Sequence, residues 1–385
     1  MENSCPKTRV FAVIFDLDGT LLNTEQVTKD ILKIFLAKYG KIQDNEKEKK
    51  RLGMTHKESA ISIVNDYDLP LTPEQFTQEI MPMYHGLWKE AKPIPGAERL
   101  MRHLHKHGIQ FALASNSLSK NIDGKISHHD GWKERFVTIL GSDQVKSGKP
   151  SPDIYIEAAK RMGVDSLHCL VIEDSLVGVK AGKSAQMTVV AVPSLQTGMD
   201  TFSVADSVLH SLLEFQPELW GLPQFEDWVG KTLPIEPIHL SGIFTNGLFH
   251  SHAENSLSVL PDQIWGLFFG WVKFDEQVSK AVISIGWSLI CCNFERKIKA
   301  CILDGSDHNV YDGKMQLLVV GYFQRSISAG NVLNNLDILD EDRETADAAL
   351  SLPAFSYKLC KSFKVENYGA EDFCVLSRKS KNVHV

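Results

Sequence analysis

The sequence predicts an α/β fold with a parallel sheet and a helical insertion, followed by a small antiparallel β-barrel. Three observations support this. Short apolar runs alternate with helix-like stretches over residues 10–192, the interval 23–92 holds only helical patterns, and residues 239–385 carry successive strand-like runs. Continuous apolar runs are typical of parallel strands buried on both faces, whereas strands joined by short turns are typical of antiparallel sheets.

Five apolar runs are expected to form the parallel sheet. They are residues 10–15, 111–114, 136–140, 169–172 and 188–192. A helix is predicted over residues 152–162, because Ser151 is placed to cap it, Pro152 suits its first position and Gly163 follows its end. This alternation predicts a doubly wound sheet within a domain covering residues 1–215.

The interval 23–92 is expected to form a helical cap. Its clearest helical patterns cover residues 27–38 and 74–89. The insertion directly follows the first strand, so we expect it over the carboxyl edge of the sheet, where open α/β folds bind ligands.

The second half of the chain has a different pattern. Residues 216–238 contain four prolines and two tryptophans, which indicates an ordered connector. Strands are expected at 267–274, 280–287, 297–303 and 316–323, with turns at Asp304-Gly305 and Asp312-Gly313 and a helix from about 332 to 350. We therefore expect a β-barrel domain over residues 239–385.

Composition excludes some classes of function. The 385 residues carry a formal net charge of −7, which argues against a dominant nucleic-acid or anionic-membrane surface. Nowhere does an apolar run reach the roughly 18 residues of a membrane span. The stretch MENSCPKTRV has no apolar signal-peptide core, and the seven cysteines show no CxxC pair. We expect a cytoplasmic protein with reduced thiols and no nucleic-acid or membrane partner; the sequence carries no signal for an oligomeric state.

The first strand ends in FDLDGT, which places Asp16 and Asp18 in one turn. One carboxylate at such a site can attack a phosphoryl group while the other transfers a proton to the leaving oxygen. Two neighbouring acids repel each other unless a cation lies between them, and oxygen ligands favour Mg²⁺. An acidic turn of this kind is also common without any function.

Three further motifs follow other predicted strands. Ser115 and Asn116 offer a hydroxyl and backbone N–H groups to phosphate oxygens. Lys149 offers a positive charge, and Glu173 and Asp174 can complete an oxygen-ligand set for Mg²⁺. Taken singly, each of these residues is more often a turn residue or a solvated one. Their order along the chain, each motif after a predicted strand, favours a phosphoryl-transfer site.

These four motifs resemble those of the haloacid-dehalogenase (HAD) phosphohydrolase superfamily, in the subgroup with a helical cap after the first motif. The resemblance covers residues 8–215. It implies that Asp16 is the nucleophile forming an aspartyl-phosphate and Asp18 the general acid and then base. The resemblance further implies that Ser115, Asn116 and Lys149 would bind the phosphoryl group, and that Asp16, the Asp18 carbonyl and Asp174 would bind Mg²⁺, with Glu173 in support.

The whole chain resembles the plant bifunctional enzymes that join an FMN hydrolase to a C-terminal riboflavin kinase. The stretches LPIEP, FFGWVKF, ISIGW, VVGYF and LDEDRETADAALSLP carry this resemblance, which implies a barrel of riboflavin-kinase type. The kinase motifs are degraded. The family's Gly-rich GRGSK-like and PTAN motifs are absent from IHLSGIFTNGLFHSHAENSLSVLP, and RKIKACIL places Lys299 where the family has its catalytic Glu.

We therefore expect a Mg²⁺-dependent phosphomonoesterase that hydrolyses FMN to riboflavin and phosphate, with an inactive kinase-like domain. Three alternatives stay open. The substrate is glycerol 3-phosphate, a sugar phosphate or a nucleoside monophosphate; or both activities are retained; or the chain is a non-enzymatic flavin-binding or interaction protein. The partner expected in the leading interpretation is a small-molecule phosphate ester.

Overall fold

The computed structural model describes residues 9–358, except 52–53, 194–198, 230, 246, 252–259, 262, 291–292, 304–312 and 324–336. By contacts the chain forms two compact units, one made chiefly of residues up to Gln224 and the other chiefly of residues from Phe225 on. Among the described residues, no helix is long and apolar enough to cross a membrane.

The first unit contains a six-stranded parallel sheet. Its strands, in the spatial order β3-β2-β1-β4-β5-β6, are Thr138–Leu140, Gln110–Ala114, Ala12–Phe15, Cys169–Glu173, Thr188–Ala191 and Ser207–Val208. Every residue of β1 and β4 is buried, as the continuous apolar runs predict. The parallel α/β architecture is confirmed, and the carboxyl ends of β1, β2 and β4 lie side by side.

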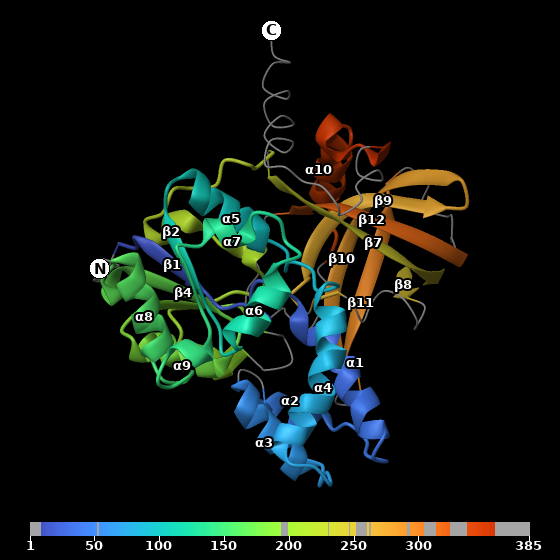
Figure 1. Cartoon of the computed structure of the whole chain (residues 1–385). Coiled ribbons are helices and arrows are strands. Elements are labelled where there is room, and N and C mark those ends of the chain that lie inside the picture. The colour runs from blue at the N-terminus through green and yellow to red at the C-terminus, as the bar shows by residue number, and fades with distance from the viewer. Residues whose placement is uncertain are drawn as a thin grey trace. The chain divides into compact units, whose positions relative to one another are not determined.

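Helices cover both faces of this sheet (Figure 1). They are α5 (Ala97–Lys106), α6 (Ser119–Ile126), α7 (Trp132–Arg135), α8 (Asp153–Met162) and α9 (Leu176–Ser184). On one face, α8 and α9 pack against alternate strand residues such as Ala12 and Ile14. Figure 1 shows α5 on the opposite side of the strands. This arrangement is doubly wound.

The expected start of the helix at 152 is one residue early. The helix α8 begins at Asp153, with Pro152 at the N-cap position and no side-chain cap. The Ser151 hydroxyl donates to the Asp153 carboxylate at 2.8 Å instead of accepting from the backbone. Its end agrees with the prediction, since Gly163 adopts a left-handed conformation with φ 70°.

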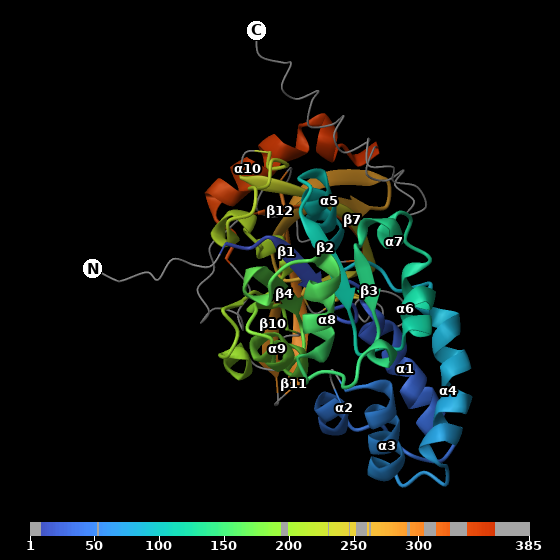
Figure 2. The same cartoon turned by 60° about the vertical axis from the view of Figure 1, so that its left-hand side comes forward.

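In its described residues the helical insertion forms four helices with a core of their own. They are α1 (Thr24–Ala37), α2 (Asn45–Arg51), α3 (His56–Asp66) and α4 (Pro73–Trp88). Phe35 of α1, Ile63 of α3 and Phe76 of α4 are buried together. Capping boxes at Thr55 and Thr72 fix the starts of α3 and α4. Figure 2 shows these helices grouped beyond one end of the sheet.

The two chain segments that connect the cap to the parallel sheet lie next to each other. Leu22 and Pro93 form an antiparallel bridge, and the backbone N–H of Asn23 donates to the carbonyl of Lys92 at 3.0 Å. Both connecting segments therefore lie next to the turn that carries Asp16 and Asp18. The cap is anchored at the edge where the acidic motifs gather.

The second unit contains a closed antiparallel barrel, as expected. Its strands, in the order β10-β11-β8-β7-β12-β9, are Gln277–Ile290, Asn293–Ile302, Leu248–Ser251, Thr232–Thr245, Gly313–Phe323 and Gly266–Phe274. Pro234 and Pro237, which are expected in the connector, lie in β7 instead. The register of β7 on β12 shifts between Val319 and Gly321, and this irregularity accommodates prolines that cannot donate to a regular ladder.

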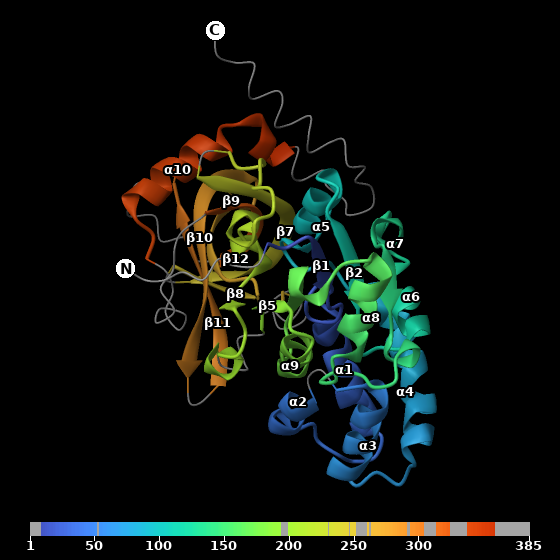
Figure 3. The same cartoon turned by 90° about the vertical axis from the view of Figure 1, so that its left-hand side faces the viewer.

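Among the described residues, the helix α10 (Asp340–Leu350) packs on this barrel. In Figure 3, α10 lies along the barrel strands. Its Ala346, Ala349 and Leu350 share a buried core with Leu267 and Phe269 of β9. The expected helix start near 332 is wrong for the described residues, because Leu339 is extended and α10 begins at Asp340. The expected turns Asp304-Gly305 and Asp312-Gly313, except Gly313, lie outside the described residues, as do 332–336.

Candidate active site

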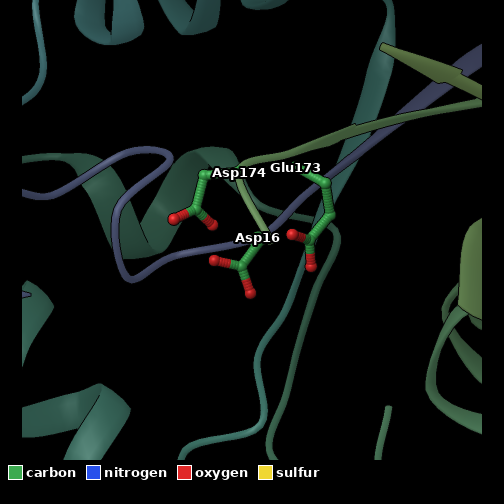
Figure 4. Close-up of side chains that lie close together, drawn as sticks. All are labelled: Asp16, Glu173 and Asp174. Atoms are coloured by element: carbon green, nitrogen blue, oxygen red, sulfur yellow. The ribbon is translucent and has the colours of Figure 1, made fainter. Parts of the chain in front are cut away.

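Three carboxylates converge where strands β1 and β4 end. Asp16 directly follows β1, Glu173 is the last residue of β4 and Asp174 comes next. Figure 4 shows the three side chains turned toward a common centre, and one oxygen from each lies within 4.8 Å of the others. Parallel strands that end at one sheet edge produce this convergence from residues distant in the chain.

Gly19 lets the turn after β1 approach Asp174. It has φ +87°, and a Cβ on it would lie 2.1 Å from Oδ2 of Asp174. Any other residue would both strain the backbone and displace this carboxylate. The Thr20 hydroxyl donates to Oδ1 of Asp174 at 3.2 Å. The glycine in FDLDGT is therefore required by the acidic cluster as well as by the turn.

Lys149 lies between two of the acids. Its Nζ is 2.6 Å from Oδ1 of Asp16 and 2.6 Å from Oε1 of Glu173. Burial by itself would lower the pKa of Lys149, but the two carboxylates outweigh burial and hold this pKa well above its usual value. The lysine is therefore a permanent cation at the nucleophile.

Glu173 holds Lys149 rather than facing the pocket. Oε1 accepts from Lys149 and, at 3.0 Å, from the Tyr155 hydroxyl, while Oε2 accepts from the backbone N–H and hydroxyl of Ser175 at 2.8 and 2.9 Å. The residue is fully buried. Its carboxylate oxygens are thus already engaged in orienting the lysine and the start of α9.

Burial makes it unfavourable for the Asp16 carboxyl group to be ionised. Burial raises its pKa to about 7, although the Lys149 ammonium opposes the shift; the charges of Glu173 and Asp18 add to it. A cation bound between Asp16 and Asp174 would relieve this cost. Their hard oxygen atoms are of the type that binds Mg²⁺, so the donor set fits that ion.

Asp18 has a separate set of partners. Its Oδ1 accepts from Thr24 Oγ1 at 2.6 Å, and its Oδ2 accepts from Ser117 Oγ at 2.8 Å. The Lys125 Nζ donates to both oxygens at 2.7 and 2.8 Å. Burial alone would raise the pKa of Asp18, but the Lys125 charge and these hydrogen bonds bring it below its usual value.

Ser115 and Asn116 follow β2 and complete the predicted set. Ser115 Oγ accepts from the backbone N–H of Ser117 at 3.1 Å and is within 3.4 Å of Asp18 Oδ2. The Asn116 side chain hydrogen-bonds the backbone of Lys149, accepting at 2.8 Å and donating at 3.3 Å. Asn116 therefore braces the segment that carries the lysine.

A pocket of about 240 Å³ opens over these residues. Its floor includes Asp16, Asp18, Ser115, Asn116, Lys149 and Asp174, so six of the seven sequence-predicted residues line it and Glu173 supports them from beneath. Its other wall comes from the cap and contains Arg51, Met54, Met81, Tyr84 and Trp88 together with the hydroxyl groups of Thr24, Thr28 and Ser59. The cap thus presents thioether and aromatic side chains to whatever group is attached to the phosphate.

Sequence reasoning missed several polar residues of the site. Thr24, Ser117 and Lys125 contact Asp18, and Tyr155 contacts Glu173. Ser117 could have been found from the SNS run after the second strand. Ser175 could have been found as the cap of the following helix. Lys125 carries no local signal, because its partner lies 107 residues away.

The fold and this site define a phosphatase of the HAD type. Residues 13–192 match the family model described as haloacid dehalogenase-like hydrolase, and residues 253–350 match the model described as riboflavin kinase. The first match contains all seven predicted site residues. The chain therefore combines a HAD-type phosphatase domain with a flavokinase domain.

The chain belongs to the bifunctional riboflavin kinase/FMN phosphatase family. It is 42% identical over 368 residues to the protein of that name from Arabidopsis thaliana, covering 92% of this chain and 97% of the relative. It is also 38% identical to (DL)-glycerol-3-phosphatase 1, mitochondrial, from the same plant, over 56% of this chain and 74% of that protein. A probable pseudouridine-5′-phosphatase from Drosophila melanogaster is 38% identical, over 57% of this chain and 97% of the relative.

Proposed function

We propose that the first unit hydrolyses FMN to riboflavin and phosphate. The cap wall of the pocket carries this proposal: Met54, Met81, Tyr84 and Trp88 face the phosphoryl site from the cap side. Aromatic and thioether groups pack well against a flat ring such as isoalloxazine, and less well against a polyol. The 42% identical relative named as an FMN phosphatase supports the same substrate.

The proposed reaction begins with attack by Asp16 on phosphorus. An Asp16 oxygen forms the new O–P bond while the bond to the ester oxygen breaks, giving an aspartyl-phosphate and releasing the alcohol. Lys149, 2.6 Å from the attacking carboxylate, stabilises the charge that develops on the phosphoryl oxygens. Ser115 and the backbone N–H groups after β2 bind those oxygens, with Asn116 holding the Lys149 segment.

Asp18 moves the protons. Asp18 is ionised in the free protein, because the Lys125 charge and its hydrogen bonds hold its pKa below the usual value, so the proton that it passes to the leaving ester oxygen enters with the monoprotonated phosphate ester. The resulting carboxylate then takes a proton from the water that attacks the aspartyl-phosphate, and gives it up as phosphate leaves. The second step regenerates Asp16 and releases phosphate. Thr24, Ser117 and Lys125 fix the Asp18 side chain at the mouth of the phosphoryl site.

Mg²⁺ is the proposed cofactor. The Asp16 carboxylate, the Asp18 carbonyl and the Asp174 carboxylate would hold it, with Glu173 in support through Lys149. When bound, the ion supplies charge neutralisation for the phosphoryl group and for the repelling acids. Asp174 is oriented for this by Thr20 and by its close approach to Gly19.

A second candidate substrate is a smaller ester. The 38% identical relatives, named for glycerol 3-phosphate and pseudouridine 5′-phosphate, favour it. The test compares Tyr84→Ala and Met81→Ala with the native chain. For an FMN phosphatase, we expect each variant to lower kcat/KM for FMN by about tenfold, with kcat/KM for glycerol 3-phosphate unchanged. Equal losses on both esters would contradict a cap wall that recognises the flavin.

We also propose that the flavokinase domain is catalytically inactive. Lys299 stands on β11, where it is exposed and pairs in register with Ser284 of β10. An ammonium at the position of a catalytic carboxylate cannot accept the proton of the riboflavin hydroxyl. Retention of both activities is the alternative, favoured by the riboflavin kinase match over residues 253–350.

The full chain carrying Asp16→Asn provides the test of kinase activity. This change removes the phosphatase nucleophile, so any FMN formed from riboflavin and ATP would accumulate. We expect no ATP-dependent FMN above a protein-free control. Robust FMN formation would establish the bifunctional alternative.

We propose a phosphatase domain at 1–215 with the cap at about 23–92. The connector and barrel, expected at 216–238 and 239–385, are proposed to meet at Thr232, where β7 begins. A cytoplasmic location is proposed because Cys169 and Cys301 are free thiols. Fractionation with and without reductant tests the location: an oxidised, compartment-enclosed protein would contradict it.

A further inference from the structure

Lys125 is a second buried cation in the phosphatase pocket, and the four sequence motifs do not include it. It lies on α6 and is only 6% exposed. Its Nζ contacts both oxygens of Asp18, at 2.7 and 2.8 Å, and Ser117 Oγ at 2.9 Å. An ammonium excluded from water in this way must be stabilised by the groups it contacts.

These contacts fix the plane of the Asp18 carboxylate. Lys125 bridges its two oxygens, Thr24 donates to one at 2.6 Å and Ser117 donates to the other at 2.8 Å. A carboxylate held by one donor can rotate about its terminal torsion, whereas one held on both oxygens cannot do so freely. Lys125 thus determines where the proton-carrying oxygens of Asp18 point.

The cap helix α4 reaches the same ammonium. The Nζ of Lys125 lies 5.1 Å from the centre of the Trp88 ring, in cation–π contact. The backbone of α6 also packs on this indole, since a Cβ at Gly124 would lie 3.3 Å from the Trp88 ring. Trp88 is the last residue of α4, so a residue of the cap and a residue of the sheet unit meet at Lys125.

We propose that Lys125 is a positioning residue that aligns Asp18 with the leaving-group oxygen, and that Trp88 holds it in place. The inference rests on the proposed proton-transfer role of Asp18. In the forward step Asp18 passes the proton of the monoprotonated phosphate ester to the ester oxygen as the P–O bond breaks; in the second step it receives one from water. Lys125 takes no proton in either step and acts by fixing the carboxyl group.

The test uses two aryl phosphates that differ in leaving group. Phenyl phosphate needs protonation of its leaving oxygen, whereas 4-nitrophenyl phosphate leaves as a stable anion. For Lys125→Met we expect kcat/KM for phenyl phosphate to fall about a hundredfold, with a loss of less than about fivefold for 4-nitrophenyl phosphate. Lys120→Met, on the exposed side of the same helix, is the matched control and should change neither value.

Competitive inhibition by inorganic phosphate separates positioning from direct binding. If Lys125 acts only on Asp18, the inhibition constant of phosphate stays within about threefold in Lys125→Met. A tenfold weaker inhibition would show that Lys125 binds the phosphoryl group, which overturns the proposal. Equal losses on the two aryl esters would also overturn it, because they would show a general structural role.

Ser117→Ala is a milder variant in case Lys125→Met does not fold. It removes the hydroxyl between Lys125 and Asp18 while leaving the ammonium paired, and we expect the same preference for 4-nitrophenyl phosphate with a smaller, roughly fivefold, difference. Trp88→Leu should lower kcat/KM for phenyl phosphate relative to kcat/KM for 4-nitrophenyl phosphate (the ester ratio). Trp88→Phe should leave this ratio unchanged. Absence of any such ratio change in both Ser117→Ala and Trp88→Leu would contradict the proposal.

None of these measurements requires FMN to be the substrate. A chain that hydrolyses aryl phosphates but not FMN would refute the proposed substrate and leave the role of Lys125 to be decided by the ester ratio. A chain that hydrolyses FMN, with equal losses on both esters in the variants, would refute the role of Lys125 alone.

Discussion

The Nζ of Lys149 lies 2.6 Å from Oε1 of Glu173, and the two side chains are 1% and 0% exposed. This is a buried ion pair beneath the nucleophile. Removing one member of such a pair leaves an uncompensated charge, which costs far more than loss of a surface pair. The Lys149–Glu173 contact is therefore both structural and functional.

Glu173→Gln should weaken this pair without changing its volume. We expect the free energy of unfolding to fall by about 3 kcal/mol and phosphate release to fall by about tenfold, because Lys149 loses its orientation. Urea unfolding followed by circular dichroism measures the first. Glu157→Gln, in the surface pair with Arg161, is the control and should change stability by less than about 0.5 kcal/mol. Similar values for the two variants would contradict the account.

Gly19→Ala should disrupt the acidic cluster. Its Cβ would collide with Asp174, so we expect Mg²⁺ binding to weaken and phosphate release to drop by at least about a hundredfold. Gly40→Ala is the matched control, because Gly40 also has a positive φ of +66° but no atom lies within 4 Å of the new Cβ. It should lose only about 1 kcal/mol of stability. Full activity in Gly19→Ala would contradict the close approach to Asp174.

Mg²⁺ affinity should depend on pH through Asp16. Burial raises the pKa of Asp16 to about 7, so below this pH the free protein carries a proton that the ion must displace. We expect the apparent binding constant to rise about tenfold per pH unit from 5.5 to 7 and to level off above about 7.5. Calorimetric titration at each pH measures this. A constant affinity over the whole range, or an unchanged pH slope in Asp16→Asn, would contradict the assignment.

Asp16→Asn should remove catalysis and preserve the fold. An amide cannot attack phosphorus, so we expect phosphate release to fall by at least about a thousandfold. Circular dichroism should match that of the native chain. Asp30→Asn, at an exposed position on α1, should keep full activity. Retained turnover in Asp16→Asn would refute the nucleophile.

Most of the pocket residues at the sheet edge can be predicted from the sequence, because parallel strands leave a clear pattern in it. Strands buried on both faces give continuous apolar runs, and their carboxyl ends meet at one edge. The positions of Asp16, Ser115, Lys149 and Asp174 follow from this arrangement.

Other features were beyond sequence reasoning for physical reasons. The contact of Lys125 with Asp18 depends on how α6 packs against the turn after β1, and no local pattern encodes that distance. Pro234 and Pro237 indicate a break in structure, yet a register shift admits them to β7. The helix expected from about residue 332 is described only from the acidic residues Asp340 and Glu341 on, because Leu339 is extended.

The proposal that FMN is the substrate is tested most directly by comparing three values of kcat/KM for phosphate release. The full chain with Mg²⁺ is assayed on FMN, glycerol 3-phosphate and pseudouridine 5′-phosphate. We expect FMN to have the highest value, by at least about tenfold, because the cap residues Met54, Met81, Tyr84 and Trp88 suit a flat ring. A value for FMN below that of either smaller ester would contradict the proposal.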